Sequence, residues 1–120
     1  MPAPKHQLKA AHAERRVQTG SWLNLASAPA AELLAGSGFD WLLIDAEHGP
    51  NSIPTILAQV QAIGNRVPVV VRPPVGETWI IKQVLDLGVQ TILVPMIEDA
   101  GHAAEMVRAM HYAPQGSRGV

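Results

Sequence analysis

The fold of this chain is decided by the stretch Phe39-Asp40-Trp41-Leu42-Leu43-Ile44-Asp45-Ala46-Glu47-His48-Gly49-Pro50. Its first half is an apolar run with no polar face, which is typical of a strand buried on both sides in a parallel sheet. Its second half changes abruptly to two carboxylates and an imidazole and then breaks at Gly49-Pro50. Because parallel α/β proteins place their sites at the carboxyl ends of strands, this stretch predicts both a strand and a site.

Composition narrows the class of protein. The chain has 120 residues, of which 48% are hydrophobic, so it can form one domain with a core. Its net charge of −1, with scattered basic residues, indicates neither a nucleic-acid nor a membrane partner. The lack of cysteine excludes disulfides and thiolate sites. Residues 1–17 lack the apolar core of a secretory signal, so the expected location is cytoplasmic.

Strands and helices are predicted to alternate along the chain. The strands cover Gly20 to Leu25, the stretch quoted above, Val67 to Val71, and part of Val89 to Ile97. The helices begin at Ser27, at Asn51 or Ser52, at Glu77 and at Asp99. The second of these helices carries one apolar face, made by Ile53, Ile56, Leu57, Val60 and Ile63. With a weak helix over Lys5 to Val17, we expect an N-terminal tip and helix over 1–18 and one domain over 19–120.

Four consecutive strand–helix units make the sheet parallel, because crossovers between parallel strands are right-handed. Two architectures fit this order. An open doubly wound sheet is one, but no G-x-G-x-x-G follows the first strand. The other is the amino-terminal half of a (β/α)8 barrel, which needs roughly 200 residues when complete. On that interpretation the first and fourth strands keep open edges, so we expect either a chain truncated at its C-terminus or a pairing partner.

Titratable side chains gather at the carboxyl ends of two neighbouring strands. Asp45, Glu47 and His48 follow the second strand, and Arg72 ends the third. Asp45 is expected to accept a hydrogen bond from His48 and so make the imidazole a better base. Arg72 is expected to hold a carboxylate or a developing oxyanion. The alternative is a structural ion pair between Arg72 and Asp45 or Glu47, with His48 as an ordinary loop residue.

Lysine and histidine usage restricts the chemistry. The only lysines, Lys5, Lys9 and Lys82, fall on predicted helices, so a Schiff base within this segment is not expected. A metal is then the natural way to stabilise an enolate, although no inner-sphere ligand set is apparent here. The remaining histidines are expected to be surface groups or to lie on the terminal helix without forming a metal pair.

Several collinear motifs make the chain resemble the HpcH/HpaI aldolase family, especially its 4-hydroxy-2-oxoheptanedioate aldolase-like members, from about Gly20 to Val120. The motifs are Ala31-Glu32-Leu33-Leu34-Ala35-Gly36, the stretch from Phe39 to His48, Val70-Val71-Arg72-Pro73, Gln90-Thr91-Ile92-Leu93-Val94-Pro95-Met96 and Ser117-Arg118-Gly119-Val120. This resemblance implies a TIM barrel and reversible, metal-dependent (class II) cleavage of 2-oxo-4-hydroxy acids to pyruvate and an aldehyde. It also implies a homo-oligomer at full length.

The resemblance also implies roles for particular residues. His48 matches the family's acid/base histidine, Asp45 its supporting carboxylate, and Arg72 the arginine that steadies the keto or enolate oxygen. Glu47 and Trp22 are expected to join Arg72 in binding substrate. The implied cofactor is Mg²⁺, Mn²⁺ or Co²⁺. Its family ligands, a glutamate in Q-x-E and an aspartate in G-P-x-D, do not occur in this sequence and are expected on a missing C-terminal half.

We therefore expect the 120-residue chain alone to be inactive and its full-length parent to be an aldolase. One alternative is a non-catalytic half-barrel that oligomerises or binds a small 2-oxo acid. A third possibility is an unrelated barrel lyase or isomerase, in which His48 and Arg72 would not be essential.

Overall fold

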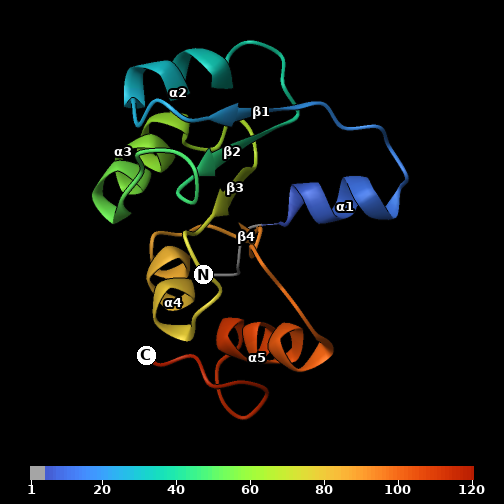
Figure 1. Cartoon of the computed structure of the whole chain (residues 1–120). Helices are drawn as coiled ribbons and strands as arrows, with labels where there is room; N and C mark the ends of the chain where they lie inside the picture. Colours follow the sequence, from blue (N-terminus) through green and yellow to red (C-terminus); the bar gives the residue numbers. More distant parts are fainter. Residues whose placement is uncertain (1–4) are drawn as a thin grey trace.

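The computed structural model describes residues 5–120, which form four strands and five helices (Figure 1). The strands are β1 (Gly20–Leu23), β2 (Trp41–Asp45), β3 (Val69–Arg72) and β4 (Thr91–Ile92). The helices are α1 (Gln7–Ala13), α2 (Ala28–Ala35), α3 (Ile53–Ile63), α4 (Thr78–Asp86) and α5 (Ala100–Met110). The predicted alternation of strands and helices is confirmed.

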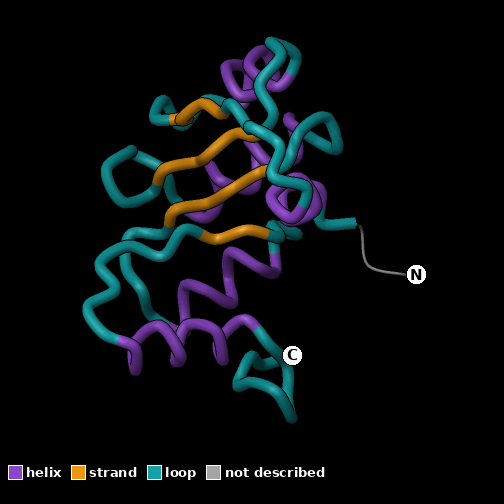
Figure 2. Tube along the Cα trace, turned by 90° about the vertical axis from the view of Figure 1, so that its right-hand side faces the viewer, coloured by secondary structure: helices purple, strands orange, loops and turns teal. Residues whose placement is uncertain are grey.

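The four strands form one parallel sheet in the order β1-β2-β3-β4, and they run side by side as orange segments in Figure 2. Each strand therefore pairs with the next one along the chain, which is the usual arrangement of consecutive strands. The register sets Trp22 beside Leu43 and Asp45 beside Arg72. The carboxyl ends of the first three strands consequently meet at one edge of the sheet.

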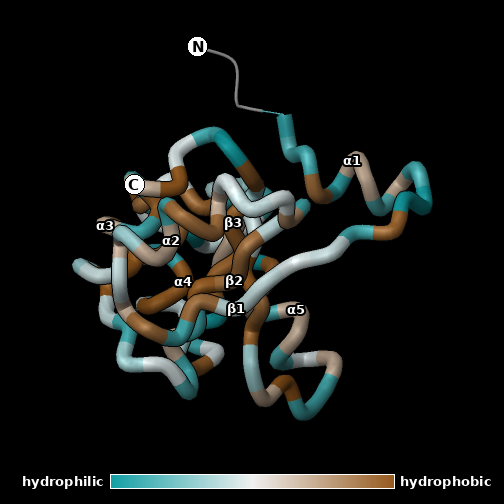
Figure 3. The backbone as a smooth tube through the Cα atoms, turned by 90° about the horizontal axis from the view of Figure 1, so that it is seen from above, coloured by the Kyte–Doolittle hydropathy of each residue, from teal (hydrophilic) through white to brown (hydrophobic). Residues whose placement is uncertain are grey.

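Helices α2, α3 and α4 cover one face of the sheet and form the larger core with it (Figure 3). Leu42, Ile44 and Val71 point to this face and are fully buried.

Two predicted helix starts are confirmed by side-chain caps. Ser27 accepts a hydrogen bond from the Ala30 amide, and Asp99 accepts one from the His102 amide.

The opposite face of the sheet is covered near β2 and β3 by α1, which lies across from α2, α3 and α4 in Figure 3. Leu8 of α1 is buried against Leu43 and Val70, with Trp41 packed beside them. Residues of a strand alternate between faces, so Leu43 and Val70 share their face with Asp45 and Arg72. On this face of the sheet, each charged residue thus lies two positions after a buried apolar residue of the same strand.

The fourth strand is shorter than the stretch within Val89 to Ile97 that was predicted to hold it. Regular pairing covers Thr91 and Ile92, and one further bond runs from the Leu93 amide to the Val71 carbonyl. Pro95 then has no N–H to donate, and Met96 takes a left-handed φ of 54°. These two residues turn the chain away from the sheet.

In the described part of the chain, no helix has the length and apolar character needed to cross a membrane.

Candidate active site

The candidate active site is built at the carboxyl ends of β2 and β3. Asp45 and Arg72 are register partners on these adjacent strands, and the Ala46 amide donates to the Arg72 carbonyl at 2.8 Å. Parallel pairing therefore continues one residue beyond β2 and fixes the two side chains next to each other. The prediction that Asp45 and Arg72 meet at one edge of the sheet is confirmed.

Arg72 binds Asp45 through two parallel hydrogen bonds. The Arg72 Nε donates to Oδ1 at 2.9 Å and its Nη2 donates to Oδ2 at 2.8 Å. Asp45 is 1% exposed, so the pair is largely shielded from water on the carboxylate side. The hydrogen bonds from Arg72 hold the pKa of Asp45 below its ordinary value, and those to Asp45 raise the pKa of Arg72. The site therefore contains a fixed cation.

Glu47 and His48 extend this cluster toward solvent. Arg72 Nη1 lies 3.0 Å from Glu47 Oε2, so one guanidinium binds both carboxylates. The His48 imidazole is 74% exposed, and its Nε2 lies 3.8 Å from Glu47 Oε1, which is too long for a hydrogen bond. Side-chain exposure therefore rises from Asp45 (1%), through Glu47 (16%) and Arg72 (19%), to His48 (74%).

The prediction that the His48 imidazole donates a hydrogen bond to Asp45 is wrong. Asp45 Oδ1 instead accepts from the backbone amides of Glu47 at 3.1 Å and His48 at 3.3 Å. Arg72 binds both carboxylate oxygens, and Oδ1 already has three donors, whereas the His48 imidazole is exposed to solvent. The structural ion pair that was the alternative interpretation is present, and it leaves His48 exposed at the same edge.

A tight turn presents Glu47 and His48. A Cβ added to Gly49 would lie 2.4 Å from the Asp45 carbonyl oxygen, so only glycine allows the turn to close this tightly. The Asn51 side chain also donates to that carbonyl, at 2.7 Å. Backbone and side-chain contacts thus hold the turn from within.

Trp22 of β1 forms one wall of the site. The Arg72 guanidinium carbon lies 4.6 Å from the centroid of the Trp22 ring, within the range of a cation–π contact. The indole is 44% exposed, so it is a wall rather than a core residue. All five residues expected at the site from the sequence therefore lie together at this edge.

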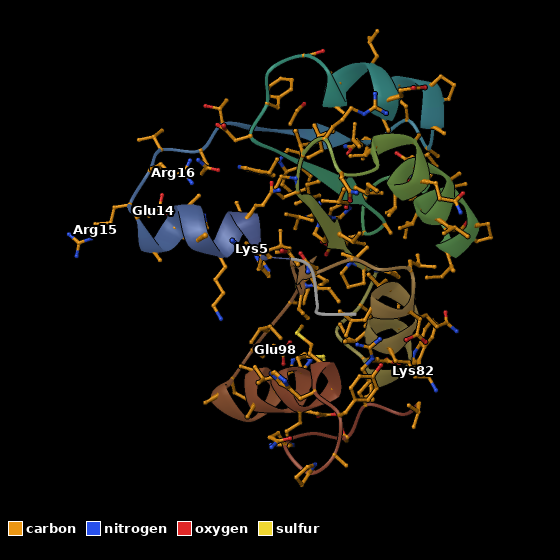
Figure 4. All side chains as sticks on the ribbon, turned by 180° about the vertical axis from the view of Figure 1, so that it is seen from behind. Lys5, Glu14, Arg15, Arg16, Lys82 and Glu98 are labelled. Atoms are coloured by element: carbon orange, nitrogen blue, oxygen red, sulfur yellow. The ribbon has the colours of Figure 1, made fainter. Side chains whose placement is uncertain are left out.

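The chain's acidic and histidine side chains do not fit a divalent cation. Within residues 5–120, no group of three or more His, Cys, Asp or Glu residues is arranged to hold a metal ion. The carboxylates nearest the site, Asp45 and Glu47, are paired with the Arg72 cation, which competes with a metal for the same oxygens. The prediction that the lysines lie on helices is confirmed for Lys9 in α1 and Lys82 in α4, whereas Lys5 precedes α1 (Figure 4).

Sequence reasoning missed two polar residues that shape the site and its surroundings. Gln59 interrupts the apolar face of α3 and is 1% exposed, hydrogen-bonded to Asn51. His102, expected at the surface, is partly buried, and its Nε2 lies 3.0 Å from the Gly76 carbonyl oxygen in the loop after β3. A glutamine within an otherwise apolar stripe was the signal for the first, and nothing in the sequence marked the second.

Comparison with known proteins agrees with this fold. Residues 18–120 match the HpcH/HpaI aldolase/citrate lyase family. The chain is 51% identical over its full length to a hydroxypyruvate/pyruvate aldolase of Roseobacter denitrificans, covering 47% of that protein. It is 53% identical, over 97% of its length, to a 4-hydroxy-2-oxo-heptane-1,7-dioate aldolase of Escherichia coli, covering 45% of it. The crystal structure of an HpcH/HpaI aldolase from Desulfitobacterium hafniense superposes with a TM-score of 0.84 at 30% identity, over 94% of this chain and 44% of that one.

The chain belongs to the HpcH/HpaI aldolase/citrate lyase family. It spans about half the length of the curated relatives that it matches. Its fold is a parallel (β/α)4 unit preceded by a short helix, which corresponds to the amino-terminal half of a TIM barrel. The family match covers residues 18–120 and so includes the elements from β1 to α5, whereas α1 precedes it.

Proposed function

We propose that this chain forms the amino-terminal half of a carbon–carbon lyase that cleaves 2-oxo-4-hydroxy acids to pyruvate and an aldehyde. The observation that carries the proposal is a single guanidinium fixed between two carboxylates, beside an exposed imidazole, at the carboxyl edge of a parallel sheet. The aldolase names of relatives such as those of Roseobacter denitrificans and Escherichia coli support it.

Arg72 would bind the keto oxygen of the substrate. A guanidinium has five N–H donors, and the contacts with Asp45 and Glu47 use one on each of its three nitrogens. The donors left on Nη1 and Nη2 are available to an oxygen that becomes an enolate during cleavage. Because Asp45 and Glu47 fix the orientation of the guanidinium, it needs little reorganisation as negative charge develops on the substrate oxygen.

His48 would move the proton. In the cleavage direction the C4 hydroxyl loses its proton, the C3–C4 bond breaks, and its electron pair enters the enolate of pyruvate. The imidazole accepts the hydroxyl proton, directly or through a water molecule, and a proton is then returned to C3. Glu47 Oε1 lies 3.8 Å from Nε2 of this imidazole.

The family resemblance implies a divalent cation, which when bound would supply positive charge to the enolate. Residues 5–120 do not provide a ligand set for it. We therefore propose that its ligands belong to a part of the parent protein outside this chain, that the 120-residue chain alone is inactive, and that the parent is a cytoplasmic homo-oligomer. The 2-oxo acid and the aldehyde are its proposed small-molecule partners.

A hybrid barrel tests this proposal. Residues 1–120 are fused to the carboxyl-terminal half of the Roseobacter denitrificans relative, and pyruvate release from a 4-hydroxy-2-oxo acid is measured with Mn²⁺ or Mg²⁺. We expect activity from the hybrid and none from the 120-residue chain. In the hybrid, His48→Ala and Arg72→Ala should each lower kcat/KM by at least about a hundredfold. The exposed His111→Ala serves as the matched control and should leave it unchanged.

The competing function is a half-barrel that binds a small 2-oxo acid without turning it over. The open edges of β1 and β4 and the free donors of Arg72 favour this candidate. Reading the coding sequence beyond Val120 discriminates the two, because Q-x-E and G-P-x-D motifs downstream are expected for the aldolase. A folded hybrid without activity, or one that keeps full activity with His48→Ala, would contradict the lyase proposal.

A further inference from the structure

The Asn51 side chain lies between the carboxyl ends of two strands. Its Nδ2 donates to the Leu23 carbonyl at the end of β1, at 3.2 Å, and to the Asp45 carbonyl at the end of β2, at 2.7 Å. Parallel pairing between these strands ends at Leu23 and Ile44, so the backbone ladder no longer joins them beyond that point. The amide of Asn51 connects the two strands where the ladder stops.

Gln59 holds this amide in the orientation that the connection needs. The Gln59 Nε2 donates to Asn51 Oδ1 at 2.7 Å and to the Thr55 carbonyl at 3.0 Å. Because Gln59 presents a donor, Asn51 must turn its oxygen toward Gln59 and its Nδ2 toward the strands. Gln59 is 1% exposed, so water does not compete with this contact. A buried polar pair is costly unless its bonds are made, and here they are made.

Asn51 is not required to begin the adjacent helix. The N-cap of α3 is Ser52, and the Ser52 amide donates to Thr55 Oγ1 at 2.7 Å. The start of the helix is therefore satisfied by its own residues. Both donor contacts of the Asn51 amide go instead to the strands that carry Trp22 and the turn with Glu47 and His48.

We propose that Asn51, oriented by Gln59, is a positioning residue of the candidate active site. By tying the ends of β1 and β2 it fixes the distance of Trp22 from Arg72 and the path of the turn that presents Glu47 and His48. The catalytic meaning of this tether rests on the proposed function. Its geometric effect does not, because the same side chains are held in the isolated chain.

Hydrogen exchange measured by NMR on the ¹⁵N-labelled 120-residue chain tests the tether. In Asn51→Ala, we expect the Glu47 amide and the Arg72 Nε–H to exchange about tenfold faster than in the unaltered chain. The Ile81 amide of α4, a core position remote in sequence from the tether, should change by less than about twofold. The matched control is Asn65→Ala, at an exposed asparagine, which should leave all three rates unchanged.

Gln59→Met gives a second, milder variant, with the exposed Gln61→Met as its control. It keeps Asn51 but removes the shorter of the two contacts to Asn51 Oδ1, at 2.7 Å, and leaves the one from Thr55 Oγ1 at 3.4 Å. The same two site protons should therefore exchange faster by a smaller factor. If Asn51→Ala does not fold, the Gln59→Met result decides. Unchanged site exchange in a folded variant, equal acceleration at Ile81, or failure of both variants to fold would overturn the positioning role. An inactive hybrid barrel with the exchange effect present would count against the proposed function alone.

Discussion

The Arg72 guanidinium and the Asp45 carboxylate meet through two parallel hydrogen bonds, of 2.9 and 2.8 Å, at the carboxyl ends of adjacent strands. Asp45 is almost fully buried, whereas the side chain of Arg72 remains 19% exposed on the side of Glu47 and Trp22. Asp45 thus anchors Arg72. The charged guanidinium of Arg72 can therefore face the open side of the site while its orientation stays fixed.

Removing the anchoring charge should cost stability. Asp45→Asn keeps the shape of the side chain but leaves Arg72 without its buried counter-charge, so the free energy of unfolding should fall by about 2–4 kcal/mol. Urea unfolding followed by circular dichroism measures it. The matched control is Asp86→Asn, which removes a carboxylate that is 62% exposed and paired with Arg118 at 2.7 Å. That change should cost at most about 1 kcal/mol, and equal losses in the two variants would contradict the buried anchor.

The same pair should make stability depend on pH in the acid range. The hydrogen bonds from Arg72 lower the pKa of Asp45 in the folded chain, whereas an unfolded aspartate titrates near about 3.9. Asp45 therefore adds stability that is complete above its unfolded pKa and is lost as pH falls through the lower, folded pKa. Urea midpoints of the unaltered chain and of Asp45→Asn should converge on acidification below about pH 4. Parallel curves down to pH 2 would rule out this contribution.

Gly20 should not tolerate a side chain. A Cβ at this position would lie 2.1 Å from Cε2 of the Trp41 indole on the neighbouring strand. Gly20→Ala should therefore push Trp41 from its place and lower the free energy of unfolding by about 1–3 kcal/mol. Gly36→Ala is the control, because its added Cβ would come no closer than 3.6 Å to the Leu33 carbonyl oxygen. Chemical denaturation should show a change of no more than about 0.5 kcal/mol in the control.

Helix α1 should contribute measurably through one leucine. Leu8 is 7% exposed and contacts Leu43 and Val70, so Leu8→Ala should lower the free energy of unfolding by about 2 kcal/mol. Leu33→Ala, at a leucine that is 73% exposed on α2, makes the same chemical change without a core contact. The two thermal midpoints should separate clearly, and indistinguishable midpoints would show that α1 does not pack stably on the sheet.

The positions of the site residues were predictable because consecutive strands joined by short connections usually lie next to each other in a sheet. Asp45 and Arg72, at the ends of the second and third strands, are therefore expected on neighbouring strand ends. Helix starts at Ser27 and Asp99 were predictable for a local reason, since each side chain caps amides within its own turn.

The choice of partners within the site was not predictable in the same way. Asp45 could pair with His48 or with Arg72, and only the planar fork of arginine fits both carboxylate oxygens at once. The role of Gln59 also required coordinates, because a polar residue on a helix can face water or a buried partner at the same sequence position. The short β4 reflects the missing donor of Pro95 and the left-handed turn at Met96, and these effects act beyond the apolar pattern that suggested a longer strand.

The contact of Leu8 with Leu43 and Val70 has a consequence for how such a protein can diverge. The family match begins at residue 18, yet the layer directly below the charged groups is completed by a residue ten positions earlier in the chain. A substitution at Leu8 would therefore change the apolar layer beneath Asp45 and Arg72 without changing a charged side chain. The curated relatives match this chain over its full length, so α1 lies within the region that they share with it.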